Sequence, residues 1–510
     1  MKKIIWAIFC ILLISPGCKK VITEVPYSFL TPQNFPTSAD EADAALIACY
    51  TTLKGPDGYG TWEYVGGLWM NAQNDVTFTF SGWAGFTSPT HGFEEDWWAD
   101  FWRGINAANN LIAALEMRDA TKDTWVIEKL AEARAIRAYF YHDLATLYGD
   151  LPFRTKPTTE IALKLPRTPV QVIYDSIIIP DLEFADGKLP VRASPAARIS
   201  AGAVKCIKAD VYMKLAGWRR SSQGEMVPGD PKYWALARDA AAGVLKMEDD
   251  GVYALDPEYS GVFTKLSTDQ PTNEVIFDLE FTKGSRAGSL FPYMYGAEGG
   301  ADPDKGGGQN SLRVIPEWLR TQDNRDERFK WNIADYAIYE GWERTPLPGD
   351  TTSWGITTFQ KIYPSKGYWQ TNVTNFPFYR LSEAKLMYAE AANEANGGPT
   401  PEAYKQINEV RYRARPAAHK TDGTILPDLA GLNQQQFREA IMNERSMEFI
   451  MEGKRRLDLI RWGIFKQKIE SLKLFEADLA SVGGFNERFY LWSLPVGDMT
   501  QNEWQNNAGF

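Results

Sequence analysis

Residues 127–152 read IEKLAEARAIRAYFYHDLATLYGDLP, and this stretch of the chain decides the fold. Apolar side chains recur in it at intervals of three and four residues, which places them on one stripe of an α-helix. The apolar positions are Ile127, Leu130, Ala133, Ile136, Phe140, Leu144 and Leu147. Gly149 and Pro152 then end the helix, because glycine favours the C-terminal cap and proline cannot continue the backbone hydrogen bonds. The pattern predicts a long amphipathic helix at 127–148 that buries one face against other helices.

The same stretch also carries a family resemblance. Its order AEARAIRAYF at 131–140, continued by YGDLP at 148–152, resembles the signature helix of SusD/RagB-like proteins, the nutrient-binding outer-membrane lipoproteins of Bacteroidota. Further blocks that resemble the family lie at 379–391, 407–411, 441–463 and 494–509, so the resemblance covers essentially the whole mature chain. It implies a mainly α fold, in which a tetratricopeptide-like scaffold of helical hairpins carries a large irregular lobe of loops and short strands.

The N-terminus reads as a targeting segment. Two lysines precede an apolar run at 4–14, which suits a signal-peptide core and is shorter than the roughly 20 residues that span a bilayer. The sequence SPGC at 15–18 resembles the bacterial lipoprotein processing site, in which Cys18 becomes the acylated N-terminus. We expect a signal peptide at 1–17 and a lipid anchor on Cys18, with an ordinary secreted protein cut nearby as the alternative. The resemblance implies an outer-membrane location that faces the cell exterior.

Composition argues against several classes of function. The net charge is −10, with acids and bases mixed throughout, which argues against nucleic acid as a partner. The three histidines are far apart, so no metal-ligand spacing connects them. Cys49 and Cys206 are expected to be buried free thiols, with a disulfide between them as the alternative. The 18 Trp and 23 Tyr leave aromatic rings available for binding.

Helical and irregular patterns divide the chain into five parts. They are a signal peptide at 1–17, an N-terminal tether at 18–37, an N-terminal helical part at 38–250, an irregular ligand-facing lobe at 251–376 and a C-terminal helical part at 377–510. Helices are predicted at 38–53, 96–116, 169–184, 199–215, 233–245 and 403–413. Residues 38–41 form a capping box for the first of them. Residues 274–281 alternate in polarity, which predicts a half-buried strand.

Aromatic and polar residues on irregular segments form the candidate binding site. The ligand-binding candidates are Asn71, Asp75, Trp83, Tyr295, Trp342 and Trp354. Sugar rings have apolar C–H faces that stack on exposed aromatic rings, and their hydroxyl groups need amide and carboxylate partners. Trp83 lies on a glycine-rich loop that offers little local structure to bury its ring. Asp75 falls where many members of the resembled family carry an aspartate.

Other conspicuous residues are assigned to the scaffold. The rings of Trp62, Trp69, Trp98 and Trp318 are expected to fill the helical core. Charged residues between 444 and 461 stand three or four positions apart, which is typical of structural ion pairs on helices and not of a catalytic site. They are Glu444, Arg445, Glu448, Glu452, Arg456, Asp458 and Arg461.

Metal and nucleotide sites find little support. The sequence DPDKG at 302–306 leaves calcium open, but Arg313 occupies the twelfth position, where an EF-hand needs an acidic ligand. The glycines at 306–308 lack the Lys-Ser/Thr pair of a phosphate-binding loop. We therefore expect no catalytic residues, no metal ligands and no cofactor, with calcium as the open alternative.

Three functions remain to be weighed. The resemblance implies a glycan-binding lipoprotein that captures oligo- or polysaccharide and delivers it to a partner SusC-like TonB-dependent outer-membrane transporter. The same architecture with peptide cargo is a second reading. A glycoside hydrolase is the third, but it needs two carboxylates across a cleft, and no sequence pattern among the 65 acidic residues selects such a pair. The chain is therefore expected to bind rather than to catalyse.

Overall fold

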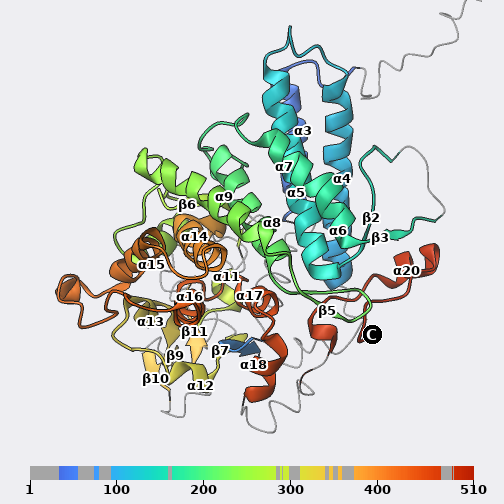
Figure 1. The fold of residues 1–510 in the computed structure, drawn as a ribbon. Helices are drawn as coiled ribbons and strands as arrows, with labels where there is room; N and C mark the ends of the chain where they lie inside the picture. Colours follow the sequence, from blue (N-terminus) through green and yellow to red (C-terminus); the bar gives the residue numbers. More distant parts are fainter. Residues whose placement is uncertain are drawn as a thin grey trace, which may run out of the picture.

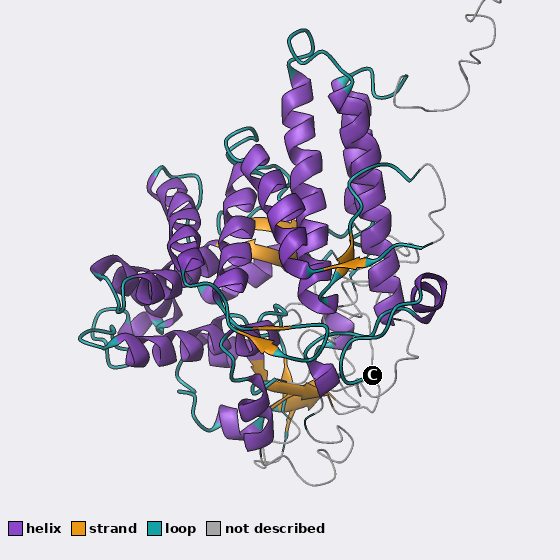
Figure 2. Cartoon of the chain, turned by 45° about the vertical axis from the view of Figure 1, so that its right-hand side comes forward, coloured by secondary structure: helices purple, strands orange, loops and turns teal. Residues whose placement is uncertain are grey.

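The computed structural model describes residues 34–54, 74–79, 93–158, 164–282, 288–289, 291–297, 310–338, 344–347, 354–358, 373–472, 485 and 487–510. Helices dominate these residues and the strands are short (Figure 2), so the predicted mainly α fold is confirmed. No helix among the described residues is both long and apolar enough to cross a membrane.

The N-terminal helices stand side by side as an upright group (Figure 1). They are α3 (Ala39–Thr51), α4 (Phe93–Glu116), α5 (Trp125–Tyr148) and α7 (Ile179–Ala185). Ser38 caps α3 by accepting a hydrogen bond from the N–H of Glu41. The Glu41 carboxylate accepts from the N–H and hydroxyl of Thr37, at 2.6 and 2.8 Å, where a complete capping box would use the N–H of Ser38.

Helix α5 is covered on nearly all sides, which corrects the prediction of a single buried face. Ile127, on the predicted apolar stripe, is 37% exposed, whereas Glu132 and Arg137, off that stripe, are buried. The guanidinium of Arg137 donates two hydrogen bonds to Asp181 on α7, at 2.8 and 2.9 Å. The carboxylate of Glu132 accepts from the hydroxyl of Tyr50 and from Arg198. Helix α5 can therefore be surrounded by neighbouring elements, because its buried charged side chains have partners there.

The helix predicted at 169–184 forms with an interruption. It consists of α6 (Val170–Ile173), a π-helical turn (Tyr174–Ile178) and α7. Pro180 lacks an N–H and its ring crowds the carbonyl four residues earlier, which displaces the regular hydrogen bonds of the turn before it. The N–H of Ile179 accordingly donates to the carbonyl of Tyr174, five residues back.

Helical hairpins then continue across the molecule toward the C-terminal part (Figure 1). They are formed by α8 (Ala201–Ala216), α9 (Lys232–Asp249), α14 (Leu381–Ala395), α15 (Pro401–Ala414) and α16 (Gln434–Glu448). Helix α9 packs on both α8 and α14, so it joins the two halves of the scaffold. Ser200 caps α8, and Asn433 with Gln436 forms a full capping box on α16. This stacking of neighbouring pairs is the tetratricopeptide-like arrangement that was predicted.

Shorter elements complete this part of the fold. They are β2 (Leu151–Pro152), β3 (Arg167–Thr168), β4 (Arg219–Arg220), β5 (Met226–Val227), α10 (Tyr259–Ser267), β6 (Val275–Leu279), α11 (Phe291–Met294), α12 (Pro316–Leu319), α13 (Glu327–Asn332), β12 (Phe376–Arg380), α17 (Arg455–Arg461), α18 (Phe465–Ser471) and α20 (Val496–Asn502). Two short 3₁₀ turns lie at Ala417–His419 and Glu487–Phe489. Cys49 and Cys206 are buried and free, which confirms the prediction of unpaired thiols.

Strand β6 pairs antiparallel with β12, and all five of its residues are buried. The predicted half-buried strand is therefore wrong, because both faces of β6 are covered. On one face, the ring of Phe277 lies 5.5 Å from that of Tyr139 on α5 and 5.0 Å from that of Phe378. On the other, Ile276 and Asp278 are also excluded from solvent.

A buried network of ion pairs connects β6, β12 and α16. Arg380, with no exposed surface, donates to Glu452 at 2.7 and 2.9 Å, to Glu448 at 2.6 Å and to Glu274 at 2.8 Å. Arg413 also pairs with Glu274, at 3.0 Å.

The same pattern extends to the other motif residues and confirms their structural role. Arg328 pairs with Glu444, and Asp458 accepts from both Arg445 and Arg461. Arg456, by contrast with the expected ion pair, donates to the backbone carbonyl of Phe489 at 3.0 Å.

Replacing Arg380 with methionine should lower the free energy of unfolding by about 3–5 kcal/mol, because buried carboxylates lose their counter-charge. Urea unfolding followed by circular dichroism measures the change. The matched control is Arg325→Ala, which removes an exposed arginine paired with Asp323 and should cost less than about 1 kcal/mol. Equal losses in the two variants would show that the buried network contributes no more than a surface pair.

Candidate functional site

A four-stranded antiparallel sheet joins segments that are far apart in the chain. Its strands, in spatial order, are β1 (Thr77–Thr79), β7 (Leu312–Val314), β11 (Gly355–Ile356) and β8 (Ile333–Ala334). Thr77 lies opposite Val314, and Gly355 lies opposite Arg313 and Ala334. Figure 1 shows the blue strand β1 among elements from the second half of the chain.

This sheet collects the backbone of several candidate stretches. Asp75 stands two residues before β1, and Trp354 directly precedes β11. The segment of Tyr295 is tied to the start of β7, because the N–H of Asn310 donates to the carbonyl of Gly296 at 3.1 Å. The stretch of Trp342 is not part of this sheet: in sequence the residue falls between β9 (Tyr336–Ile338) and β10 (Arg344–Pro346), which form a separate two-stranded sheet.

Several predicted residues lie outside the part of the chain that the structure describes. They are Cys18, Asn71, Trp83 and Trp342, the core candidates Trp62 and Trp69, and the calcium candidate at 302–306. Within the described residues, no group of three or more His, Cys, Asp or Glu side chains is arranged to hold a metal ion.

Asp75 anchors β1 and is already paired. Its buried carboxylate accepts two hydrogen bonds from Arg455, at 2.6 Å from Nε and 2.8 Å from the terminal nitrogen. The side-chain oxygen of Asn74 accepts from the N–H groups of Val76 and Thr77, both at 2.8 Å, which fixes the turn into the strand. The carboxylate oxygens of Asp75 thus hold the first residue of α17, which gives Asp75 a positioning role, and its direct contact with ligand stays a prediction.

Tyr295 is part of the aromatic core, which corrects its prediction as a ring available to ligand. The side chain is only 2% exposed. Its ring lies 5.8 Å from that of Phe291, which in turn stacks on Phe376 at 4.8 Å. Tyr295 thus belongs to an aromatic cluster to which α11 contributes Phe291 and β12 contributes Phe376.

Trp354 packs against the hydrophobic core and keeps part of its surface exposed. Its side chain is half-buried, and its indole N–H is buried with no hydrogen-bond partner among the described residues. Leaving such a donor unpaired costs about 1–3 kcal/mol, so an acceptor from a ligand would be stabilising there. The backbone carbonyl of Trp354 accepts from the N–H of Val314 at 3.1 Å, which fixes the residue to the sheet. Gly355 is required next to it, because a Cβ would collide with the side chain of Asn310.

Two other tryptophans belong to the core, as predicted. Trp318 is 9% exposed, and its indole N–H donates to the hydroxyl of Ser446 at 3.1 Å. Trp98 is buried against the ring of Tyr148 on α5, with the centroids 5.0 Å apart.

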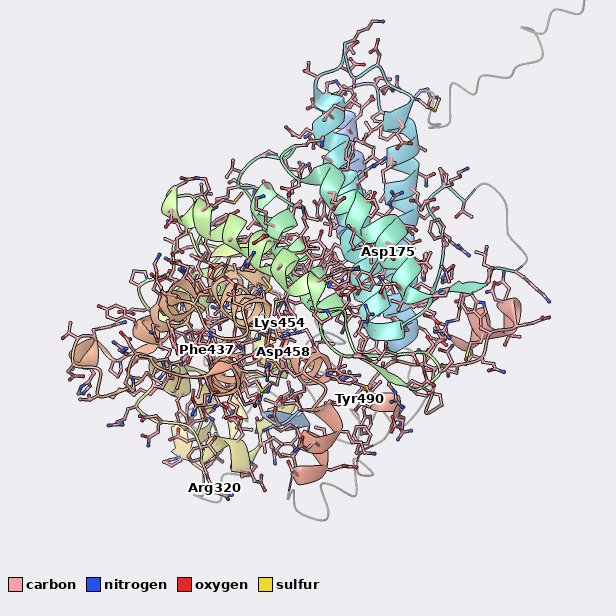
Figure 3. All side chains as sticks on the ribbon, viewed as in Figure 1. Asp175, Arg320, Phe437, Lys454, Asp458 and Tyr490 are labelled. Atoms are coloured by element: carbon pink, nitrogen blue, oxygen red, sulfur yellow. The ribbon has the colours of Figure 1, made fainter. Side chains whose placement is uncertain are left out.

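Sequence reasoning missed a polar cavity of about 70 Å³ where α5, α8, α14 and α17 meet. Figure 3 places two of its lining residues, Lys454 and Asp458, near the middle of the molecule. Lys454 pairs with Glu383 at 3.1 Å, and the hydroxyl of Tyr379 donates to Asp210 at 2.8 Å. The cavity is large enough for water and too small for a saccharide. The signal that could have revealed it is the run of polar residues inside the signature helix.

Burial shifts the protonation of this interior. It raises the pKa of Asp143, which lines the cavity, to about 7, and Asp210 contributes in the same direction. Burial likewise raises the pKa of Glu452 to about 7 against the opposing effect of Arg380. It lowers the pKa of Lys214 to about 8.

The shift at Asp143 makes stability depend on pH. The folded protein binds this proton more tightly than the unfolded chain, so its contribution is fully present below about pH 4 and is lost as the pH rises toward 7. The free energy of unfolding should therefore fall across this window, by at most about 4 kcal/mol from this group. Asp143→Asn should flatten the fall. Urea unfolding at intervals of pH tests this, and an identical slope in the variant would contradict the assignment.

The Asp75–Arg455 pair makes a second prediction. Asp75→Ala and Arg455→Ala should destabilise the protein by similar amounts, with a coupling of about 0.5–3 kcal/mol in the double-mutant cycle. If Asp75 acts through position alone, both single variants should also weaken ligand binding equally. Loss of binding in Asp75→Ala with unchanged binding in Arg455→Ala would instead support a direct ligand contact.

Two family models match separate parts of the chain. The model described as SusD family matches residues 273–504, and the model described as starch-binding associating with outer membrane matches residues 71–213. A relative named SusD-like protein P25, from Formosa agariphila, is 26% identical over 90% of this chain and 89% of its own length.

Solved structures share the fold. A SusD homologue from Bacteroides thetaiotaomicron is 22% identical, with a TM-score of 0.81 over 94% of this chain and 98% of that one. Surface glycan-binding protein A from Bacteroides fluxus is 21% identical, with a TM-score of 0.73 over 93% of this chain and 100% of that one. Two family models thus match separate parts of a chain with this tetratricopeptide-like fold, its relative of similar length is SusD-like, and the chain is a SusD/RagB-like protein.

Proposed function

We propose that this protein binds extracellular oligo- or polysaccharide and delivers it to a partner SusC-like TonB-dependent transporter in the outer membrane. The observation that carries the proposal is the four-stranded sheet, in which β7 links the entry of β11, with the half-buried ring of Trp354, to β1 and the Asp75 stretch before it. The similar protein from Bacteroides fluxus is named a surface glycan-binding protein, and one matching family model is described as starch-binding.

The chemistry of the candidate residues fits a sugar. The apolar face of a pyranose ring can stack on an indole, and its hydroxyl groups accept and donate hydrogen bonds at the rim. Trp354 offers both a ring and an unpartnered N–H among the described residues. Asn71, Trp83 and Trp342 complete the proposed contact set.

Binding without catalysis is part of the proposal. Glycoside hydrolysis requires two carboxylates about 5–9.5 Å apart across the sugar, one of them free to act as an acid. Asp75, the acidic candidate beside the sheet, is engaged by Arg455. The buried carboxylates of the C-terminal helices are held in ion pairs, as at Glu448.

The proposed location follows the N-terminal sequence. Removal of residues 1–17 would leave Cys18 as an acylated N-terminus, and each buried methylene of an acyl chain contributes about 0.8 kcal/mol to membrane binding. Two or three chains would hold the protein stably on the outer membrane, facing the exterior beside its transporter.

Purified mature protein should bind at least one member of a polysaccharide panel saturably. Trp83→Ala and Trp354→Ala should each weaken that binding at least about tenfold, or about 1.4 kcal/mol, because a stacked ring is removed. Isothermal titration calorimetry measures the affinities. The control is Tyr412→Ala, which removes an exposed ring from α15, away from the sheet.

Two results would overturn the proposal in different directions. If the protein binds oligopeptides and no polysaccharide, its ligand is a peptide. If the pure protein releases shortened sugars, it is a hydrolase. Unchanged glycan binding in both tryptophan variants would move the site elsewhere.

A further inference from the structure

A second pocket, of about 330 Å³, lies on the helical scaffold and uses none of the residues discussed above for glycan binding. It is built from the ends of α8 and α17 together with α9, α14 and α16. Figure 1 shows α8 and α17 meeting near the centre of the view. Its lining residues are Ala216, Gly217, Trp218, Trp234, Glu390, Glu394, Arg438, Arg461 and Trp462.

Three indole rings from three separate elements face this pocket. Trp218, just after α8, is 41% exposed, an unusual position for so large an apolar ring. Trp234 on α9 and Trp462 after α17 are partly buried. An exposed ring beside two others in a concave site marks a binding surface more than a packing surface.

Trp218 is held in place by its neighbours, so the ring is a preformed platform. The backbone N–H of Trp218 donates to the backbone carbonyl of Arg461 at 2.8 Å, which fixes the position of the residue. Gly463 lies against the ring: a Cβ there would come within 2.7 Å of its Cδ1 atom, and the residue has a φ of +74°. The ring therefore contacts the backbone of Gly463 at one end, and part of its remaining surface is exposed to solvent.

The polar groups of the pocket are charged but compensated. Glu390 and Glu394 stand one turn apart on α14. Glu394 accepts from Arg438 at 2.8 and 2.6 Å, and Glu390 pairs with Arg461 and accepts from the indole N–H of Trp462 at 2.7 Å. Two carboxylates thus meet two guanidinium groups, and the site offers hydrogen-bonding atoms without a net charge.

We propose that this pocket is a second saccharide site that takes a neutral mono- or disaccharide unit. Stacked rings match the apolar face of a sugar, and the Arg438–Glu394 pair at the rim supplies donors and acceptors for its hydroxyl groups. A compensated charge set gives no preference to an ionic ligand. The volume is near the lower end of ligand pockets, about 300–1,000 Å³, which suits a short sugar and not a long chain. This pocket would bind a saccharide unit at a point separate from the sheet.

Fluorine NMR of the full mature protein labelled with 5-fluorotryptophan tests the proposal. The Trp218 resonance is assigned from Trp218→Phe, and maltose, cellobiose and xylobiose are titrated to millimolar concentrations. At least one of them should shift the Trp218 resonance saturably. In the variants the titration is followed at the resonances of Trp234 and Trp462, which line the same pocket and are kept. Trp218→Ala should weaken that disaccharide about tenfold, while Trp218→Phe should retain it because a stacking ring remains. Because Trp218 is exposed, both variants should fold normally, and their thermal unfolding temperatures check this.

The control and the contrary results separate this site from the one on the sheet. Tyr412→Ala should leave disaccharide binding unchanged, and Trp354→Ala should lower polysaccharide binding without moving the Trp218 response. Absence of a saturable shift for all three disaccharides, or equal disaccharide affinity in Trp218→Ala and wild type, would overturn the second site. Neither of these results bears on the sheet, whose test is the polysaccharide affinity of Trp354→Ala.

Discussion

The buried guanidinium of Arg380 is the constraint on which the rest of the structure depends. A charge without exposed surface must be compensated, so Glu274, Glu448 and Glu452 have to arrive at one point. These three carboxylates come from the lead-in to β6, from the end of α16 and from the turn that follows it. Satisfying one arginine therefore fixes the β6–β12 pair against the C-terminal helices.

The position of the sheet follows from this constraint in a few steps. The turn that carries Glu452 leads directly into α17, which begins at Arg455. Arg455 holds Asp75, and Asp75 sets the start of β1. Strand β1 pairs with β7, and β7 pairs with β11, whose entry carries Trp354. The rigid helical part and the ring proposed to touch sugar are thus connected by a continuous series of ion pairs and backbone hydrogen bonds.

Much of this scaffold could be predicted from the sequence. Periodicity and caps located the helices because both are local signals, as Ser38 and Gly149 show. The extent of burial could not be read locally: α5 hides Glu132 and Arg137 because their partners lie on other helices. The π-helical turn before Pro180 had a visible signal in the proline itself.

The candidate site was predictable only in outline. Loop composition selected irregular segments, and the sheet joins strands from several of them, but individual contacts depended on distant partners. Asp75 meets an arginine 380 positions away, and Tyr295 packs on Phe291, whose ring stacks in turn on Phe376 of β12. The three-tryptophan pocket escaped notice because its rings are separated in sequence, with Trp234 inside α9 and the other two just after the ends of α8 and α17. Long-range pairing, which no local pattern encodes, decides these cases.

Hydrogen–deuterium exchange with and without the tightest-binding polysaccharide tests the central claim most directly. If the sheet binds the polysaccharide and the helical scaffold does not change, peptides that contain β1 and β11 should be more protected from exchange when the polysaccharide is present. Helices α5, α14 and α16 should exchange equally in both states. Protection confined to these helices, with none at β1 or β11, would contradict the account.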